Sequence, residues 1–453
     1  MAVTMDGQRF AQAVKATDLL RVVGLLPLAA VASGLVLPVS AQQVHLATAD
    51  RSAPTQAPAL MTEDPSLRVL LFEGASLVLS AASGPLLLRD AAGLVLAEVS
   101  PGQELRVAPD PLSSTGMRWQ LGEGTPLAVA ATELWLEPEA PEAVVLLQQR
   151  QYRGQLQLRR QPAALQAINH VSLETYLPSV VGSEMPASWP LQALSAQAVA
   201  ARTYALRQRR PGEPFDLRAT VSSQVYRGLD SETAATRQAV ATTRGQVLTY
   251  DGRLIDAVFH SSSGGSTEAS GDLWPQQLPY LVAVQDFDEE SPARSWQERF
   301  EPLQLQRLFA EIGGVTDVAV LARTSSGRLR QVRLKGPGGV LQLSGAELRQ
   351  RLGLRSTWVE IDVVRPVDAA IQPPLGSEPA TLAGVPPLPE PPGPLQVQPQ
   401  PLGVTLVIRG RGFGHGIGMS QWGAYGLARR GASYSAILSH YYPGTQLDAF
   451  RGP

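Results

Sequence analysis

Short apolar runs recur from residue 67 onward, and they limit the fold of this chain more than any other feature of its sequence. They are four to six residues long, the usual length of strands, whereas helices need about ten or more residues. The runs are 67–72, 76–80, 84–88, 104–107, 143–147 and 155–158. They predict a β-rich N-terminal region over residues 66–160, of the sandwich or meander type.

Helical periodicity follows this region. The small and apolar residues that share one helical face are Leu194, Ala198, Ala201 and Ala205. They predict a helix over 190–209, and a second helix is expected over 231–243. Two strands should follow over 246–250 and 254–260, joined by the turn-forming pair Asp251-Gly252. We therefore expect an α+β fold with mixed, largely antiparallel strands and a few helices.

Residues 366–401 are rich in proline and show no periodicity, which predicts a disordered loop. The segments before and after it, 358–364 and 404–408, both resemble strands. We therefore interpret the proline-rich segment as an interruption within one domain over residues 161–448. A linker between two domains is the alternative.

The N-terminus has the layout of a signal peptide. A basic lead precedes an apolar stretch over residues 22–39, and Val39-Ser40-Ala41 offers compact residues for cleavage. This predicts a signal peptide over 1–41, a flexible spacer over 42–65, and an exported protein of the periplasm or cell envelope. The alternative is an uncleaved membrane anchor, because the stretch approaches the length of a membrane span.

The composition excludes several functional classes. The chain has 38 basic and 40 acidic side chains and no basic stripe that would neutralise phosphates, so no nucleic-acid partner is expected. It has no cysteine, which excludes disulfides, thiolate nucleophiles and zinc sites built on sulfur.

Glu184 is the first candidate for chemistry. It lies in an apolar segment shortly before the helix predicted at 190–209. If its carboxyl lines a dry cleft, desolvation would raise its pKa, as a general acid requires near neutral pH. Alternatively, the carboxylate caps the free N–H groups of that helix, which would lower its pKa. The residues alone leave both interpretations open.

Two further segments combine glycine with polar side chains. Residues 259–268 are rich in Ser and Gly and could bring backbone N–H groups to a ligand, although most such stretches are turns. Residues 410–426 have glycine at every second position from 410 to 418, with His415 and three aromatic residues. Aromatic rings beside polar groups can line a sugar subsite, whereas the spacing excludes a phosphate-binding loop. A simply packed His415 is the alternative.

Taken together, these segments and the closing run His440–Thr445 resemble the SpoIID/LytB family (stage II sporulation protein D). The similarity extends over about residues 66–448, apart from the proline-rich insertion. It implies an α+β body around a glycan-binding cleft and a peptidoglycan lytic transglycosylase. A non-catalytic glycan-binding enhancer of a cell-wall amidase is the alternative within the family, and a purely structural exported protein is a third hypothesis.

The resemblance also implies roles for individual residues. The glutamate of the family's Glu-Met-Pro motif is catalytic and corresponds to Glu184. It would protonate the glycosidic oxygen and then act as base while the 6-hydroxyl of muramic acid closes a 1,6-anhydro ring, so no second carboxylate is needed. The candidates for substrate binding are Gln197, Arg202, Tyr204, Ser262, Ser263, His415, Gln421 and Trp422.

This chain departs from the family in one respect. Some members carry a zinc ion held partly by cysteine near the Ser-Gly-Gly segment, whereas this chain keeps His260 and has no cysteine. We therefore expect no metal and no other cofactor. A role in sporulation does not follow from the resemblance, since the domain is not confined to spore formers.

Overall fold

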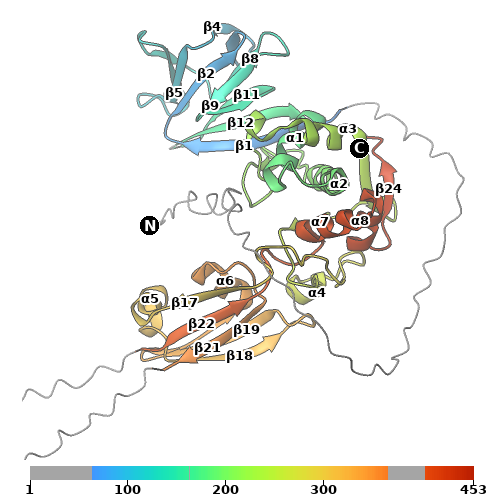
Figure 1. Ribbon diagram of the computed structural model, residues 1–453. Coiled ribbons are helices and arrows are strands. Elements are labelled where there is room, and N and C mark those ends of the chain that lie inside the picture. Colours follow the sequence, from blue (N-terminus) through green and yellow to red (C-terminus); the bar gives the residue numbers. More distant parts are fainter. Residues whose placement is uncertain (1–63, 163, 366–402, 453) are drawn as a thin grey trace, which may run out of the picture. The chain divides into compact units, whose positions relative to one another are not determined.

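The computed structural model describes residues 64–162, 164–365 and 403–452 (Figure 1). The predicted signal peptide, the proline-rich insertion and all but two residues of the predicted spacer lie outside the described residues. Within the described ranges, no helix is long and apolar enough to cross a membrane. The fold there is α+β with mostly antiparallel sheets, which confirms the predicted class.

The N-terminal part is a β-sandwich of two sheets. One sheet has the strand order β13-β1-β12-β11-β8-β3-β4 and the other β10-β9-β2-β5-β6-β7. Their strands are β1 (Ser66–Gly74), β2 (Leu77–Ser83), β3 (Leu86–Asp90), β4 (Val95–Val99), β5 (Glu104–Pro109), β6 (Met117–Leu121), β7 (Leu127–Val129), β8 (Glu133–Pro138), β9 (Val144–Leu147), β10 (Arg150–Tyr152), β11 (Gln155–Arg160), β12 (Leu165–Ser172) and β13 (Leu217–Arg218). Alternate residues are buried, as in β5 and β11, and both sheets contribute to one core.

The first sheet continues beyond residue 160. Strand β12 pairs with β1 from Ser66↔Ser172 to Gly74↔Leu165, and the chain enters helix α1 (Leu173–Glu184) directly from it. The residue that ends α1 is therefore held by a helix anchored on the sandwich.

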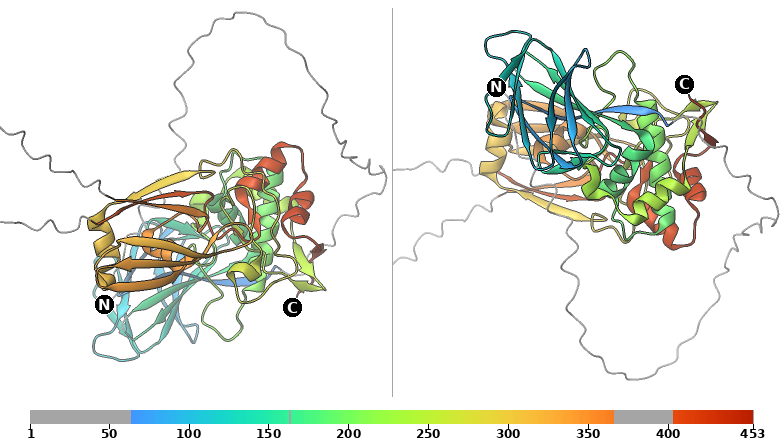
Figure 2. Two further views of the ribbon diagram at one scale, coloured as in Figure 1. Left: turned by 90° about the horizontal axis from the view of Figure 1, so that it is seen from below. Right: turned by 90° about the horizontal axis from the view of Figure 1, so that it is seen from above.

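Helix α2 (Leu191–Arg207) matches the helix predicted at 190–209, and α3 (Ala234–Thr242) matches the second, with the 3-10 turn η1 (Gly228–Ser231) before it. Helix α2 is almost entirely buried, because it packs against α1, α3, α7 (Gln421–Arg429) and α8 (Tyr434–Tyr441) (Figure 2). Its small residues permit this close packing on several sides.

Strand β14 (Gln246–Tyr250) confirms the first strand of the predicted hairpin, and Asp251 and Gly252 both have positive φ, at 49° and 71°. The second strand, predicted over 254–260, is wrong. Only β15 (Arg253–Leu254) pairs with β14, whose other edge takes β24 (Gln446–Ala449). Strand β16 (Phe259–His260) pairs instead with β23 (Met419–Ser420), which lies 160 residues later in the chain. Because residues 259–260 pair with that distant strand, they do not extend the hairpin.

A second core, which the sequence did not predict, lies in the segment between the two glycine-containing motifs. One antiparallel sheet has the order β17-β22-β21 and another β18-β19-β20. The elements are β17 (Trp296–Phe300), α5 (Pro302–Leu308), η2 (Ala310–Ile312), β18 (Asp317–Arg323), β19 (Leu329–Gly336), β20 (Gly339–Ser344), α6 (Gly345–Leu352), β21 (Val359–Val364) and β22 (Thr405–Gly410). Strands β21 and β22 pair through Val364↔Thr405, so both ends of the proline-rich insertion leave from neighbouring strands of one sheet.

Candidate active site

The three sequence motifs meet at one pocket of about 530 Å³. Glu184 comes from the first motif, residues 259–261 from the second, and residues 413–415 and Gln421 from the third. The remaining lining residues are Tyr204, Val221, Ser222, Ser223, Val258, Trp274 and Arg349. The pocket therefore collects residues from the sandwich-anchored helices, from both glycine-containing motifs and from α6 of the second core.

Glu184 is the last residue of α1, and the sequence explains why the helix stops there. Met185 is extended, with φ −131° and ψ 143°, as the residue before a proline must be. One carboxylate oxygen of Glu184 accepts a hydrogen bond from the Val225 N–H at 2.9 Å, and the other accepts one from Gln421 Nε2 at 3.2 Å. The carboxyl is thus fixed by two donors from distant parts of the chain.

The surroundings of Glu184 distinguish the two environments expected for its carboxyl. Burial raises the pKa of Glu184 above its ordinary value, and the hydrogen bonds from Val225 and Gln421 offset this only in part. A helix C-terminus also disfavours a carboxylate, because its carbonyls carry partial negative charge. The capping interpretation is wrong, since α2 begins after Pro190 without any side-chain cap.

Glu184 is the only acidic residue among the residues that line the pocket. The other lining side chains are hydroxyls, an amide, aromatic rings, two valines, two histidines and Arg349. A reaction that needs two carboxylates on opposite sides of a bond has no second carboxylate in this lining, whereas chemistry by one carboxyl is possible.

The two histidines of the pocket are neutral at neutral pH. Burial lowers the pKa of His415 to about 4 and the pKa of His260 well below its ordinary value. His415 accepts the Ile417 N–H on Nδ1, at 3.1 Å, so its Nε2 donates to the Phe259 carbonyl at 3.0 Å. His260 donates from Nδ1 to the Ile417 carbonyl at 3.1 Å, which leaves Nε2 as an acceptor. Within the described chain that Nε2 is buried without a partner, so it can accept a hydrogen bond from a ligand.

The raised pKa of Glu184 predicts a pH-dependent effect on stability. In the folded state the carboxyl holds its proton to higher pH than in the unfolded state, so its stabilising contribution is full at about pH 4 and is lost as pH rises through the folded pKa. Glu184→Gln does not titrate. We therefore expect the unfolding temperature of the variant to rise relative to that of the wild type as the pH increases from about 4 to about 8.

Calorimetry at both pH values measures this difference, with Glu98→Gln, an exposed carboxylate on β4, as the control. A difference between Glu184→Gln and wild type that does not change with pH would show that the carboxyl is not desolvated.

Two predicted binding residues, Ser262 and Ser263, lie behind the pocket and are buried. Their hydroxyls donate to Asp288 and Asp286, and the Gly264 N–H also donates to Asp288, at 2.7 Å. A Cβ atom on Gly412 would lie 2.6 Å from the Ser262 carbonyl oxygen, so glycine allows the third motif to pass this loop closely. In the structure, these serines shape the loop that carries Ser261 into the pocket.

The other predicted binding residues divide into two groups. Tyr204, His415 and Gln421 line the pocket. Gln197 and Arg202 are fully buried in α2 and do not. Trp422 also lies outside the lining, where its ring contacts Trp189 and Tyr425 at centroid distances of 4.7 and 5.4 Å. Substrate contact by Gln197, Arg202, Ser262, Ser263 and Trp422 stays a prediction.

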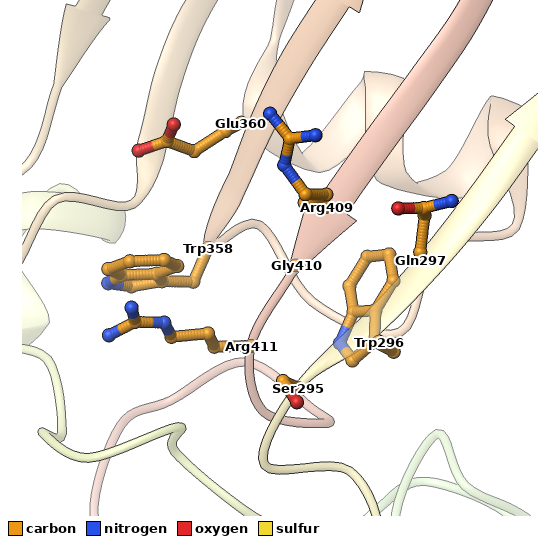
Figure 3. Close-up of a pocket in the computed structure, with 8 residues that line it drawn as sticks. All are labelled: Ser295, Trp296, Gln297, Trp358, Glu360, Arg409, Gly410 and Arg411. Carbon is orange, nitrogen blue, oxygen red and sulfur yellow. The ribbon is translucent and has the colours of Figure 1, made fainter.

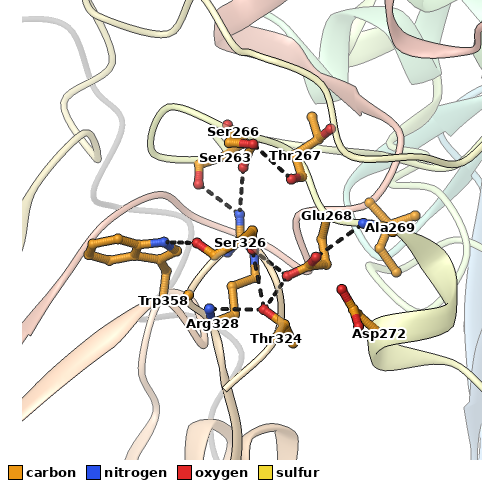
Figure 4. A network of polar contacts seen from close by, with 12 residues as sticks. Ser263, Ser266, Thr267, Glu268, Ala269, Asp272, Thr324, Ser326, Arg328 and Trp358 are labelled. Atoms are coloured by element: carbon orange, nitrogen blue, oxygen red, sulfur yellow. Dashed lines mark hydrogen bonds and ion pairs between the residues drawn. The ribbon is translucent and has the colours of Figure 1, made fainter.

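Arg328, in the turn between β18 and β19, joins the second core to the pocket loop (Figure 4). Its guanidinium is fully buried and donates from Nη2 to the Ser263 carbonyl at 2.7 Å, while its Nε lies 3.8 Å from Glu268. A Cβ atom on Gly416 would come within 2.5 Å of this guanidinium. The buried ion pair therefore holds residues 263–268 and the glycine-rich segment together.

Sequence reasoning missed Arg349, Trp274 and the backbone of Val225. Arg349 lies on α6, whose capping box at Ser344 and Glu347 predicts only a helix start, not a direction toward the pocket. No signal in the sequence could have placed these residues, because their positions depend on how segments far apart in the chain pack together. No group of three or more His, Cys, Asp or Glu side chains that could hold a metal ion occurs in residues 64–162, 164–365 and 403–452.

Comparison with known proteins gives consistent matches. The family described as stage II sporulation protein matches residues 161–250, which include Glu184. An amidase enhancer of Bacillus subtilis (strain 168) is 33% identical over 296 residues, which is 60% of this chain and 40% of the relative. Two stage II sporulation D proteins, from Bacillus amyloliquefaciens and Bacillus subtilis (strain 168), are each 31% identical over 62% and 63% of this chain. The match covers 75% and 78% of those two proteins, but less than half of the amidase enhancer.

Proposed function

Because this chain belongs to the stage II sporulation protein D family, we propose that it is an exported lytic transglycosylase that cleaves the glycan strands of peptidoglycan. The observation that carries the proposal is Glu184, a carboxyl with a raised pKa in a pocket that has no other acidic lining residue. Such a carboxyl is protonated further toward neutral pH than an ordinary one, and it is positioned by two hydrogen-bond donors.

The chemistry needs only this one carboxyl. Glu184 gives its proton to the glycosidic oxygen as the bond from that oxygen to C1 of the muramic acid breaks, and the bonding electrons leave with the oxygen. The resulting Glu184 carboxylate then takes the proton from the 6-hydroxyl of the same muramic acid, while that oxygen bonds to C1. Glu184 ends protonated, as it began, and no water is consumed.

The residues around Glu184 support both halves of this cycle. The Val225 N–H and Gln421 amide stabilise the carboxylate that forms after the first proton transfer. His260 Nε2, a neutral acceptor, can hold a sugar hydroxyl or amide, and Arg349 supplies positive charge at the lining. Neither histidine competes as the proton donor, since both are neutral at neutral pH.

The product decides the mechanism. We would incubate the chain lacking residues 1–41 with peptidoglycan and with peptide-free glycan strands, and analyse the fragments by mass spectrometry. Fragments that end in 1,6-anhydro-muramic acid would support the transglycosylase. Fragments with ordinary reducing ends would contradict it, because they require a water molecule as the nucleophile.

A second candidate function comes from the relative named amidase enhancer, which is 33% identical. In this role the pocket would bind glycan without cleaving it, and the protein would stimulate a separate cell-wall amidase. Absence of cleavage, together with stimulation of an amidase that survives Glu184→Gln, would favour this function over the transglycosylase.

An aromatic cluster beside the pocket supplies a further prediction. Trp422 follows Gln421 directly and packs with Trp189 and Tyr425, all three partly exposed. Aromatic rings of this kind stack on sugars, so we expect Trp422→Ala to weaken binding of glycan strands by about three- to tenfold, which titration calorimetry would measure.

The matched control is Trp119→Ala, a partly exposed tryptophan on β6 of the sandwich. Equal loss of binding in both variants would indicate a general effect on folding and would contradict a role for Trp422 in glycan binding.

A further inference from the structure

We propose a second carbohydrate-binding site, distinct from the active-site pocket, on the face of the sheet β17-β22-β21 (Figure 3). It is a pocket of about 580 Å³ that would take the part of a glycan strand extending beyond Glu184. The proposal rests on the proposed function, because it assigns the ligand by the same substrate class. Its lining residues are Ser295, Trp296, Gln297, Trp358, Glu360, Arg409, Gly410 and Arg411.

The register of the three strands brings the polar lining residues to one face. Gln297 pairs with Arg409, and Arg409 pairs with Glu360, so the three form a row across the sheet. Trp358 precedes Glu360 by two residues, and Arg411 follows Arg409 by two residues. Because every second residue of a strand points to the same face, these two side chains lie on the same side of the sheet as the row. The charged and amide side chains of this row are exposed, and Arg409 forms an ion pair with Asp362 of β21 at 2.5 Å.

The two tryptophans of the pocket are held in place by the protein itself. Trp358 Nε1 donates to the Ser326 carbonyl at 2.9 Å, and the Arg411 guanidinium stacks on its ring at 4.3 Å from the centroid. Trp296 Nε1 donates to the Gly412 carbonyl at 2.8 Å. Its ring lies against Gly410, where a Cβ atom would be 2.1 Å from it. Figure 3 shows the ring of Trp358 on one side of Gly410 and the ring of Trp296 on the other.

This combination of groups suits a sugar better than an apolar or a purely anionic ligand. An aromatic ring and a stacked guanidinium offer a flat surface for the C–H face of a sugar. Gln297 and Glu360 can bond hydroxyl and N-acetyl groups, and the two arginines can bond carbonyl or carboxylate oxygens. Trp358 needs little reorganisation on binding, since its ring N–H already has a partner, whereas Trp296 is mostly buried in the second core and supports the wall of the pocket.

The chain links this pocket closely to the active site. Gly410 and Arg411 line the second pocket, and Phe413 and Gly414 line the pocket of Glu184. Arg411 and Phe413 are two residues apart, so their Cα atoms are separated by at most about 7 Å. A second segment runs beside this one, because the Arg411 N–H donates to the Trp358 carbonyl and the Gly414 N–H to the Arg355 carbonyl, each at 3.0 Å. We therefore expect a polymer to reach both pockets and a short oligosaccharide to fill only one.

Binding as a function of strand length tests the second site. Peptide-free glycan strands, separated by length and labelled at one end, would be titrated against the purified full chain carrying Glu184→Gln, so that no strand is cut. Adding Trp358→Ala or Arg409→Gln should weaken binding of long strands about tenfold and change binding of the shortest strands less than about twofold. Arg409 is exposed, so its variant keeps the test valid if Trp358→Ala fails to fold. The matched control is Arg333→Gln, an exposed arginine on β19 outside this pocket, which should change neither.

Two results would overturn the second site: long strands bound as tightly by Arg409→Gln as by its parent, or the same loss for strands of every length. Catalysis is judged separately, from the products of the protein that retains Glu184. Length-dependent binding without cleavage would keep the second site and reject the transglycosylase. Cleavage by the protein that retains Glu184, together with unchanged binding of long strands by the Trp358 and Arg409 variants, would keep the transglycosylase and reject the second site.

Discussion

Glu184→Gln should lower kcat/KM for glycan cleavage by about 10³-fold, because the residue acts as acid in the first step and as base in the second. Glutamine keeps the size of the side chain and its acceptor oxygen for the Val225 N–H, so the pocket should keep its shape. The rate at which 1,6-anhydro ends appear measures the effect. The wild-type rate should also fall as pH rises through the raised pKa of Glu184, since the first step needs the protonated carboxyl.

Two further variants sharpen this test. Glu184→Asp keeps the carboxyl group but shortens the side chain by one methylene group. Its cleavage rate should therefore lie between the rates of Glu184→Gln and the wild type. Glu98→Gln removes an exposed carboxylate on β4 and should leave the rate unchanged. Cleavage by Glu184→Gln at the wild-type rate would reject Glu184 as the acid.

Arg202→Met should destabilise the protein by about 3–5 kcal/mol, since it removes one partner of a buried ion pair. Arg202 is fully buried and donates to both carboxylate oxygens of Glu174, at 2.7 and 3.0 Å, and to the Gln246 carbonyl at 3.2 Å. Methionine fills similar space but leaves the buried Glu174 carboxylate without its charged partner. Denaturant unfolding measures the loss, and Glu174→Leu in the Arg202→Met background should recover much of it.

Arg207→Met is the matched control on the same helix. Its guanidinium is about half exposed and lies 3.7 Å from Asp256, so its loss should cost less than about 1 kcal/mol. The same pair of variants tests the prediction from sequence that Arg202 binds substrate. A stable Arg202→Met protein with a raised KM would favour substrate binding over the structural role.

The sequence was informative wherever structure depends on near neighbours. The spacing of Leu194, Ala198 and Ala201 placed α2 within two residues at each end. Asp251-Gly252 placed a tight turn, because few other pairs accept positive φ at both positions. The short apolar runs before residue 160 predicted strands β1, β2, β3, β5, β9 and β11 of the sandwich for the same local reason.

Local reasoning failed where distant packing outweighed propensity. Helix α1 contains Pro178 and the β-branched pair Val180-Val181, which weaken the helical signal, yet its burial against α2 and α3 stabilises it. The strand expected over 254–260 gave way because Phe259 and His260 found partners in β23. The second core was missed because nothing in the sequences of its short strands indicates which strands pair with one another.

The same division applies to the candidate site. The sequence by itself singled out Glu184, the two glycine-containing motifs and the family that they resemble, because those features are patterns of residue type along the chain. Only the tertiary structure excluded the helix-cap interpretation of Glu184, because it desolvates the carboxyl and brings Val225 and Gln421 to its oxygens. The physical reason is that helix periods and turns depend on a few adjacent residues, whereas the pKa of a carboxyl depends on every group that replaces water around it.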